Sequence, residues 1–142
     1  MKRITVLLAD DNGVVREEFK KILELEGDLE VVGEAKNGHQ AVAMVKKLRP
    51  ALVLMDVTMP LLNGFQATRR ILQAFPATKV LFLSAHTDEA YILEAVNAGA
   101  MGYLLKQTSA GCICAAIREV QKGNTFFSAS IPKRLHKRNR EK

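Results

Sequence analysis

The sequence predicts an α/β fold in which helices cover both faces of a five-stranded parallel sheet. Two observations lead to this prediction. Short apolar runs alternate five times with stretches whose apolar residues repeat at helical spacing. Most of these runs are apolar without alternation, so both faces of each strand need cover, and intervening helices provide it. A chain of 142 residues is long enough for one such domain.

The strands are expected at the short apolar runs, and the helices at apolar sets that end before a Gly or Pro. The strands are residues 4–9, 30–34, 51–55, 79–83 and 101–105. The helical sets are Val15, Phe19, Ile22 and Leu23 before Gly27; Ala41, Val42, Val45 and Leu48 before Pro50; Phe65, Thr68, Ile71, Leu72 and Phe75 before Pro76; Ile92, Ala95 and Val96 before Gly99; and Ile113, Ala116, Ile117 and Val120 before Gly123. Thr87 or Asp88 is expected to cap the fourth helix. Right-handed crossovers then make a doubly wound (βα)5 sheet, with the flavodoxin-like strand order 2-1-3-4-5 favoured at this size.

The charge of the chain is unevenly distributed. Of the net charge of +6, five units belong to residues 132–142, so the rest of the chain is nearly neutral. This basic stretch has no interleaved aromatic residues and no paired helix pattern, which makes sequence-specific DNA reading by it a poor interpretation. A solvated tail is favoured over non-specific attraction to phosphates.

No apolar run approaches the roughly 20 residues that a membrane span requires, and we identify no signal peptide. We therefore expect a cytoplasmic protein without a membrane partner. Cys112 and Cys114 are two positions apart on a predicted helix and should not face each other, so we expect reduced, buried or half-buried thiols.

Chemically active side chains follow four of the five predicted strands. They are Asp10 and Asp11 after the first, Asp56 after the third, Ser84 after the fourth and Lys106 after the fifth. In an open parallel sheet these positions meet at one edge, which is where ligands bind. Two carboxylates about 4 Å apart repel by roughly 4 kcal/mol at an effective dielectric near 20, and Mg²⁺ would relieve this. A carboxylate nucleophile, a metal, a cation and a hydroxyl donor together favour phosphoryl transfer.

Each of these residues taken alone has a simpler explanation. An Asp after a strand is usually a turn former or helix cap, and a Lys there is usually solvated. The interpretation therefore depends on the combination of complementary groups at four separate strand ends.

The sequence resembles the receiver domains of two-component response regulators over residues 3–130. The matching features are Asp10-Asp11, the run Leu54-Met-Asp-Val-Thr-Met-Pro60 with Gly64 downstream, Ser84-Ala85, and Lys106 preceded by Tyr103. Residues 31–38 and 102–106 are similar to the receivers of LuxR/NarL-type transcription factors. A receiver domain (1–124) would then be followed by a basic extension or the start of a linker (125–142).

The resemblance implies a Mg²⁺-dependent phosphoacceptor. Asp56 would accept the phosphoryl group, and Asp11, Asp56 and the backbone carbonyl of Thr58 would hold Mg²⁺, with Asp10 acting through a coordinated water. Lys106 would pair with the phosphoryl oxygens.

The resemblance also implies a switch. Ser84 would donate to the bound phosphoryl group, and Tyr103, otherwise a half-buried strand aromatic, would turn inward when Ser84 moves. The helix 4, strand 5 and helix 5 surface would then change. Thr58 and His86 stand where relatives tune loss of the phosphoryl group, although His86 has a simpler interpretation as a loop residue. Asn12 replaces a frequent His without a consequence that we can name.

The implied partner is a sensor histidine kinase, with homodimer formation on phosphorylation. Two explanations of the short chain compete: the N-terminal part of a DNA-binding transcriptional regulator, whose output domain this chain lacks, or a single-domain regulator that acts through protein contacts. The protein is not expected to be an enzyme beyond its own phosphoryl transfer and dephosphorylation. Haloacid-dehalogenase-type phosphatases are a weaker alternative, because they require a second Asp where this chain has Thr58. An unphosphorylated scaffold is the structural alternative.

Overall fold

The computed structural model describes residues 2–127 and confirms the alternation of strands and helices. The strands are β1 (Ile4–Ala9), β2 (Leu29–Ala35), β3 (Leu52–Met55), β4 (Lys79–Ser84), β5 (Gly102–Leu105) and β6 (Phe126–Phe127). The helices are α1 (Gly13–Glu24), α2 (Gly38–Leu48), α3 (Gly64–Ala74), α4 (Glu89–Ala98) and α5 (Ala110–Gln121). Asp88 precedes α4 as predicted, but its side chain makes no capping hydrogen bond.

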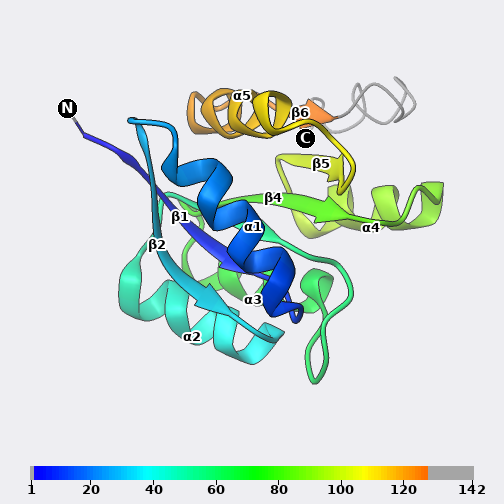
Figure 1. Cartoon of the computed structure of the whole chain (residues 1–142). Helices are drawn as coiled ribbons and strands as arrows, with labels where there is room; N and C mark the ends of the chain where they lie inside the picture. The colour runs from blue at the N-terminus through cyan, green and yellow to red at the C-terminus, as the bar shows by residue number, and fades with distance from the viewer. Residues whose placement is uncertain (1, 128–142) are drawn as a thin grey trace.

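The strands form one parallel sheet in the order β2-β1-β3-β4-β5-β6 (Figure 1). The order of the first five strands confirms the flavodoxin-like prediction. The chain moves outward from β1 to β2 and then crosses back to β3 on the other side of β1. This reversal between β1 and β3 is the topological switch point at which such sheets bind ligands.

β6 was not predicted, because a strand of two residues has no alternation to detect. Its formation depends on a close backbone approach: a Cβ at Gly102 would lie 2.1 Å from the carbonyl oxygen of Phe126. β6 begins just beyond residue 124, where the sequence predicted the end of the domain. Most of the predicted basic extension, residues 128–142, lies outside the described residues.

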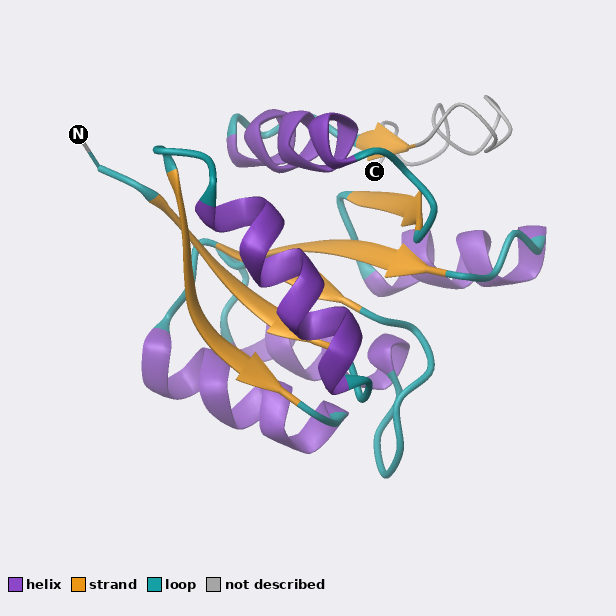
Figure 2. Ribbon diagram, in the orientation of Figure 1, coloured by secondary structure: helices purple, strands orange, loops and turns teal. Residues whose placement is uncertain are grey.

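The core has two layers, one on each face of the sheet (Figure 2). Helices α2, α3 and α4 pack on one face, and α1 and α5 pack on the other. Alternate residues of β1 serve different layers, with Leu7 facing α2–α4 and Leu8 facing α1 and α5. Because both faces are covered, the polar groups of the strands are confined to the ends of the sheet.

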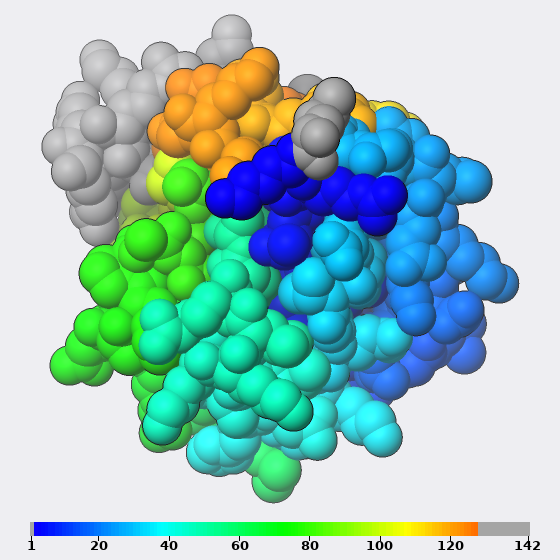
Figure 3. Space-filling view, turned by 90° about the vertical axis from the view of Figure 1, so that its left-hand side faces the viewer, coloured from blue at the N-terminus to red at the C-terminus, as the bar shows by residue number. Residues whose placement is uncertain are grey.

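The strand register brings the carboxyl ends together. Ala9 is opposite Met55 in the sheet, and Met55 is opposite Phe82, so the residues that follow β1 and β3 leave the sheet side by side. Figure 3 faces the opposite end of the molecule, where the N-terminal stretch (dark blue) lies at the surface below α5 (orange). Within residues 2–127, no helix has the length and apolar character that a membrane span needs.

Candidate functional site

Three carboxylates meet where β1 and β3 end. Oxygens of Asp10, Asp11 and Asp56 all lie within 4.8 Å of one another. Asp10 and Asp56 are each only 6% exposed, whereas Asp11 is exposed. The backbone N–H of Asp56 donates to the carbonyl of Ala9 at 2.9 Å, which extends the β1–β3 ladder to the cluster. The predicted convergence of these residues is therefore present.

Lys106, directly after β5, is the cation of this cluster. Its Nζ lies 2.9 Å from Oδ2 of Asp10 and 3.6 Å from Oδ2 of Asp56. Burial alone would lower the pKa of Lys106, but hydrogen bonds and charges from Asp10 and Asp56 outweigh burial and raise the pKa above its ordinary value. Lys106 therefore stays charged at neutral pH and faces the carboxylate of Asp56.

The pKa of Asp56 is raised from 3.8 to about 6. Burial is the main cause, followed by the negative charge of Asp10, and Asp11 adds a smaller repulsion. Lys106 and a backbone hydrogen bond from Val57 oppose the rise without cancelling it. The ionised carboxylate is thus energetically costly in the absence of further positive charge.

Gly64 has a steric role beside Asp56. A Cβ at this position would lie 2.1 Å from the backbone oxygen of Asp56, and the Gly64 N–H donates to the carbonyl of Val57 at 2.8 Å. The start of α3 therefore packs directly against the backbone of Asp56. This contact explains why a residue without a side chain is needed eight positions after the carboxylate.

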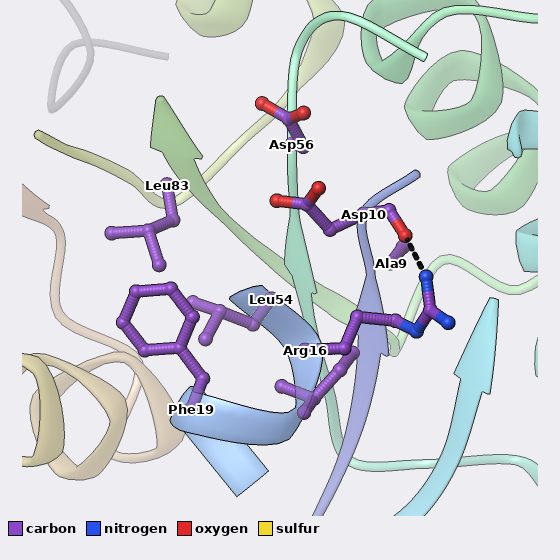
Figure 4. A pocket seen from close by; sticks show the side chains of 8 residues that line it. Ala9, Asp10, Arg16, Phe19, Leu54, Asp56 and Leu83 are labelled. Carbon is purple, nitrogen blue, oxygen red and sulfur yellow. Dashed lines mark hydrogen bonds between the residues drawn. The ribbon is translucent and has the colours of Figure 1, made fainter. Parts of the chain in front are cut away.

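The donor set of the cluster suits Mg²⁺. Carboxylate oxygens are the ligands that a hard divalent cation prefers, and one lysine leaves the three acids with excess negative charge. A cavity of about 10 Å³ lies beneath Asp10 and Asp56, roughly the space for one water molecule, so a larger ligand has no room there (Figure 4). A ligand of the cluster must approach from the solvent side, where Asp11 and Thr58 are exposed.

Ser84 and Tyr103 are both fully buried and both bond to His86. The Ser84 hydroxyl accepts a hydrogen bond from the backbone N–H of His86 at 3.0 Å. The Tyr103 hydroxyl donates to the backbone carbonyl of His86 at 2.8 Å. The Tyr103 ring is thus already inside in this structure, in the position expected of it after switching; the movement itself stays a prediction.

The side chain of His86 bridges two loops of the site. Its Nε2 and the hydroxyl oxygen of Thr58 form a hydrogen bond of 3.0 Å, which links the loop after β3 to the loop after β4. The imidazole also packs on Tyr91 of α4, with ring centroids 4.3 Å apart. His86 is therefore more than an unattached loop residue, and its influence on phosphoryl loss stays a prediction.

Arg16 of α1 is a site neighbour that the sequence reasoning missed. Its Nη1 donates to the backbone carbonyl of Asp10 at 2.6 Å (Figure 4). A signal was present, because Arg16 lies three and seven positions before Phe19 and Leu23, the buried residues of α1. A charged residue on the buried stripe of a helix needs a partner. Here the partner is the Asp10 carbonyl, in residues 10–12 between β1 and α1, which we call the acidic turn.

Comparison with known proteins agrees with the geometry. The family model of the response regulator receiver domain matches residues 6–118. The chain belongs to this family. The transcriptional regulatory protein DegU of Brevibacillus brevis is 38% identical over 138 residues, which cover 97% of this chain and 58% of DegU. This receiver chain spans just under three fifths of the length of the first curated relatives that it matches.

Solved receiver structures have the same fold. A LuxR-family two-component response regulator from Aurantimonas sp. SI85-9A1 superposes with a TM-score of 0.89 at 30% identity, covering 99% of this receiver chain and all of that chain. The isolated REC domain of RcsB from Salmonella enterica serovar Typhimurium, in the presence of phosphomimetic BeF3⁻, gives a TM-score of 0.84 at 26% identity, with coverage of 94% and 99%. Membership of the family favours the receiver interpretation over the phosphatase alternative.

The cysteine prediction is confirmed for this receiver domain. Cys112 is half-buried and Cys114 is buried, and both are free thiols. Burial raises the pKa of Cys114, so its thiol stays protonated at neutral pH.

Proposed function

We propose that this receiver domain accepts a phosphoryl group on Asp56 from a sensor histidine kinase in a Mg²⁺-dependent reaction. The observation that carries the proposal is the meeting of three carboxylates within 4.8 Å with the Lys106 ammonium 3.6 Å from Asp56. The solved relative with a phosphomimetic supports the same chemistry in a domain of this fold.

Asp56 is the nucleophile in this proposal. One of its carboxylate oxygens attacks the phosphorus of a phosphohistidine, a P–O bond forms, the P–N bond breaks, and the histidine nitrogen leaves with the electron pair. Near neutral pH most Asp56 side chains are ionised, because the pKa is about 6. Lys106 offers its ammonium protons to the transferring phosphoryl oxygens, and this stabilises the charge that they carry.

Asp10, Asp11 and Asp56, with the backbone carbonyl of Thr58, would hold Mg²⁺. When bound, the metal supplies positive charge to the carboxylates and to the phosphoryl oxygens. Asp10 keeps its contact with Lys106, so it fits the expected role through a coordinated water better than a close direct role. Asp11, the exposed acid, is free of such a contact with Lys106.

The response to phosphorylation would begin at Ser84. A phosphoryl group adds roughly −1.5 to −2 charges and strong acceptor oxygens beside a buried hydroxyl. Because Ser84 and Tyr103 are both tied to the His86 backbone, a change at Ser84 reaches the loop before α4 and the β5 aromatic together. The surface of α4, β5 and α5 is then the signalling surface.

The output of the domain is also a proposal. DegU and other matched relatives are transcriptional regulators, so we favour a DNA-binding regulator in which DNA contacts come from an output domain outside residues 2–127. The alternative is a regulator that acts through protein contacts. Homodimer formation on phosphorylation and a cytoplasmic location stay predictions.

The test is phosphorylation by acetyl phosphate with Mg²⁺, followed by intact-mass measurement. We expect wild type and the distant control Asp28→Asn to gain one phosphoryl group, and Asp56→Asn to gain none. Equal modification of wild type and Asp56→Asn would refute the assignment. Sustained turnover of a phosphomonoester would refute the receiver function.

A further inference from the structure

Arg16 is a nearly buried cation that the proposed phosphoryl chemistry does not use. Its side chain is only 11% exposed, on the face of α1 that also buries Phe19 and Leu23. Burying a guanidinium is costly unless each of its donors is paired. The groups to which the Arg16 guanidinium bonds therefore indicate its structural role.

Arg16 bonds to a carboxylate of the neighbouring strand β2 and to the backbone of the acidic turn. Its Nε donates to Oε1 of Glu34 in β2 at 2.9 Å, and its Nη1 donates to the backbone carbonyl of Asp10 at 2.6 Å. Figure 4 shows the guanidinium reaching this carbonyl while the Asp10 carboxylate lies on the side of Asp56. Glu34 thus orients the guanidinium, and the guanidinium fixes one peptide group of the turn.

That peptide group is the one that joins Asp10 to Asp11. The other peptide of Asp10 is also fixed, since its N–H donates to the carbonyl of Ala35 at 3.0 Å. Beyond it, the N–H of Asn12 donates to Oδ1 of Asp10 at 2.9 Å. Because a peptide is planar, a bond to the Asp10 carbonyl also sets the direction in which the Asp11 Cα leaves the turn.

We propose that Arg16, oriented by Glu34, is a positioning residue that places the carboxylates of Asp10 and Asp11 for Mg²⁺. This inference rests on the proposed function, because it assumes that the acidic cluster binds the metal. Arg16 contacts neither the metal nor the phosphoryl group in this scheme; its contact with the site is the hydrogen bond to the Asp10 carbonyl, so it acts through the backbone of the acidic turn.

The direction in which Mg²⁺ affinity changes when Arg16 is substituted distinguishes a positioning role from a purely electrostatic one. Arg16 is a cation near a site for a cation, so loss of its charge alone would reduce repulsion and tighten Mg²⁺ binding. Loss of an anchor that holds ligand groups in place should weaken binding instead, typically by 10-fold or more for groups just outside the ligand shell. The two explanations predict opposite directions.

The experiment is calorimetric titration of MgCl₂ into the folded domain, well below the melting temperature of each variant. We expect Arg16→Gln to weaken Mg²⁺ binding by about 10-fold. The matched control is Lys20→Gln, one turn further along α1. Lys20 Nζ lies 4.0 Å from Oε2 of the same Glu34 but does not contact the turn, so this variant removes an equal charge without the anchor and should bind at least as tightly as wild type.

A second measurement distinguishes positioning from general destabilisation of the fold: the phosphorylation rate of Arg16→Gln at saturating Mg²⁺. At saturating Mg²⁺, Arg16→Gln should be phosphorylated by acetyl phosphate at close to the wild-type rate, because the metal restores the turn. A rate that stays low at saturating Mg²⁺ would overturn the positioning role.

A second pair of variants covers the case in which Arg16→Gln does not fold. Glu34→Gln keeps an oxygen that accepts from Arg16 and should bind Mg²⁺ within about 2-fold of wild type, whereas Glu34→Ala leaves the guanidinium unoriented and should bind it more weakly. Equal affinities for these two variants would overturn the proposal. So would unchanged or tighter binding by folded Arg16→Gln. Failure of wild type to bind Mg²⁺ would overturn the proposed function as well.

Discussion

Replacing Asp56 with asparagine should stabilise the metal-free protein, although it removes the residue on which the proposed function depends. The carboxylate has a pKa of about 6 in the folded protein against an ordinary value of 3.8. A shift of this size corresponds to about 3 kcal/mol at neutral pH, and partial contact with solvent at the site lowers the expected gain to about 1–3 kcal/mol. Asparagine keeps the shape of the side chain and removes the charge.

The gain should depend on pH in a defined direction. Because the pKa of Asp56 is raised on folding, wild type loses stability as pH rises from 3.8 to about 6. The advantage of Asp56→Asn should therefore be small near pH 4, grow through this window and level off above it. Urea unfolding in EDTA across the window measures it, and added Mg²⁺ should reduce the advantage because wild type binds the metal with one more carboxylate.

Asp28→Asn is the matched control with the opposite expectation. A hydrogen bond from Arg118 lowers the pKa of Asp28, so loss of this carboxylate should destabilise the protein near neutral pH. If Asp56→Asn proved less stable than wild type in EDTA, or if its gain in stability did not change with pH, the cost of burying the ionised Asp56 carboxylate beside Asp10 would not be the cause of the difference.

Three further outcomes follow from the same site. Lys106→Met leaves Asp10 and Asp56 without their ammonium partner, so urea unfolding in EDTA should show a free energy of unfolding lower by about 1–3 kcal/mol. Because the pKa of Lys106 is raised on folding, wild type should lose this stabilisation only as pH rises above the ordinary lysine pKa of 10.5. Gly64→Ala should cost about 1–3 kcal/mol because the added Cβ meets the Asp56 backbone, whereas Gly27→Ala, with nothing within 4 Å, should not show this clash. Acetyl phosphate labelling of Gly64→Ala should be slower than that of the Gly27 control, and equal rates would contradict a role for the close approach.

The core and the strand ends were predictable because their signals are local. Apolar runs and helical spacing locate the strands and helices, and the rule that ligands meet at the carboxyl ends of a parallel sheet brings Asp10, Asp56, Ser84 and Lys106 together. The sequence could not supply the side-chain partners. Those depend on the register between strands, such as Ala9 against Met55, which no local pattern encodes.

The residues that sequence reasoning missed or left open act through the backbone or across loops. Arg16 bonds to a backbone carbonyl, and because every residue has one, the sequence does not show which residue Arg16 contacts. The contact of His86 with Thr58 joins positions 28 residues apart, and its existence depends on how two loops settle against each other. A charge on a buried helical stripe was the one local clue that could have been followed.

The short β6 strand connects the last described residues of the chain to β5. Tyr103 pairs in the sheet with Phe127, the last residue that the structure describes, so the buried aromatic and the departing chain share one ladder. Because β5 and β6 are hydrogen-bonded directly, a displacement of β5 would also displace Phe127, and no movement of α5 is needed for this. Phe127 is thus joined by the β5–β6 ladder to the strand that carries the proposed switch residue Tyr103.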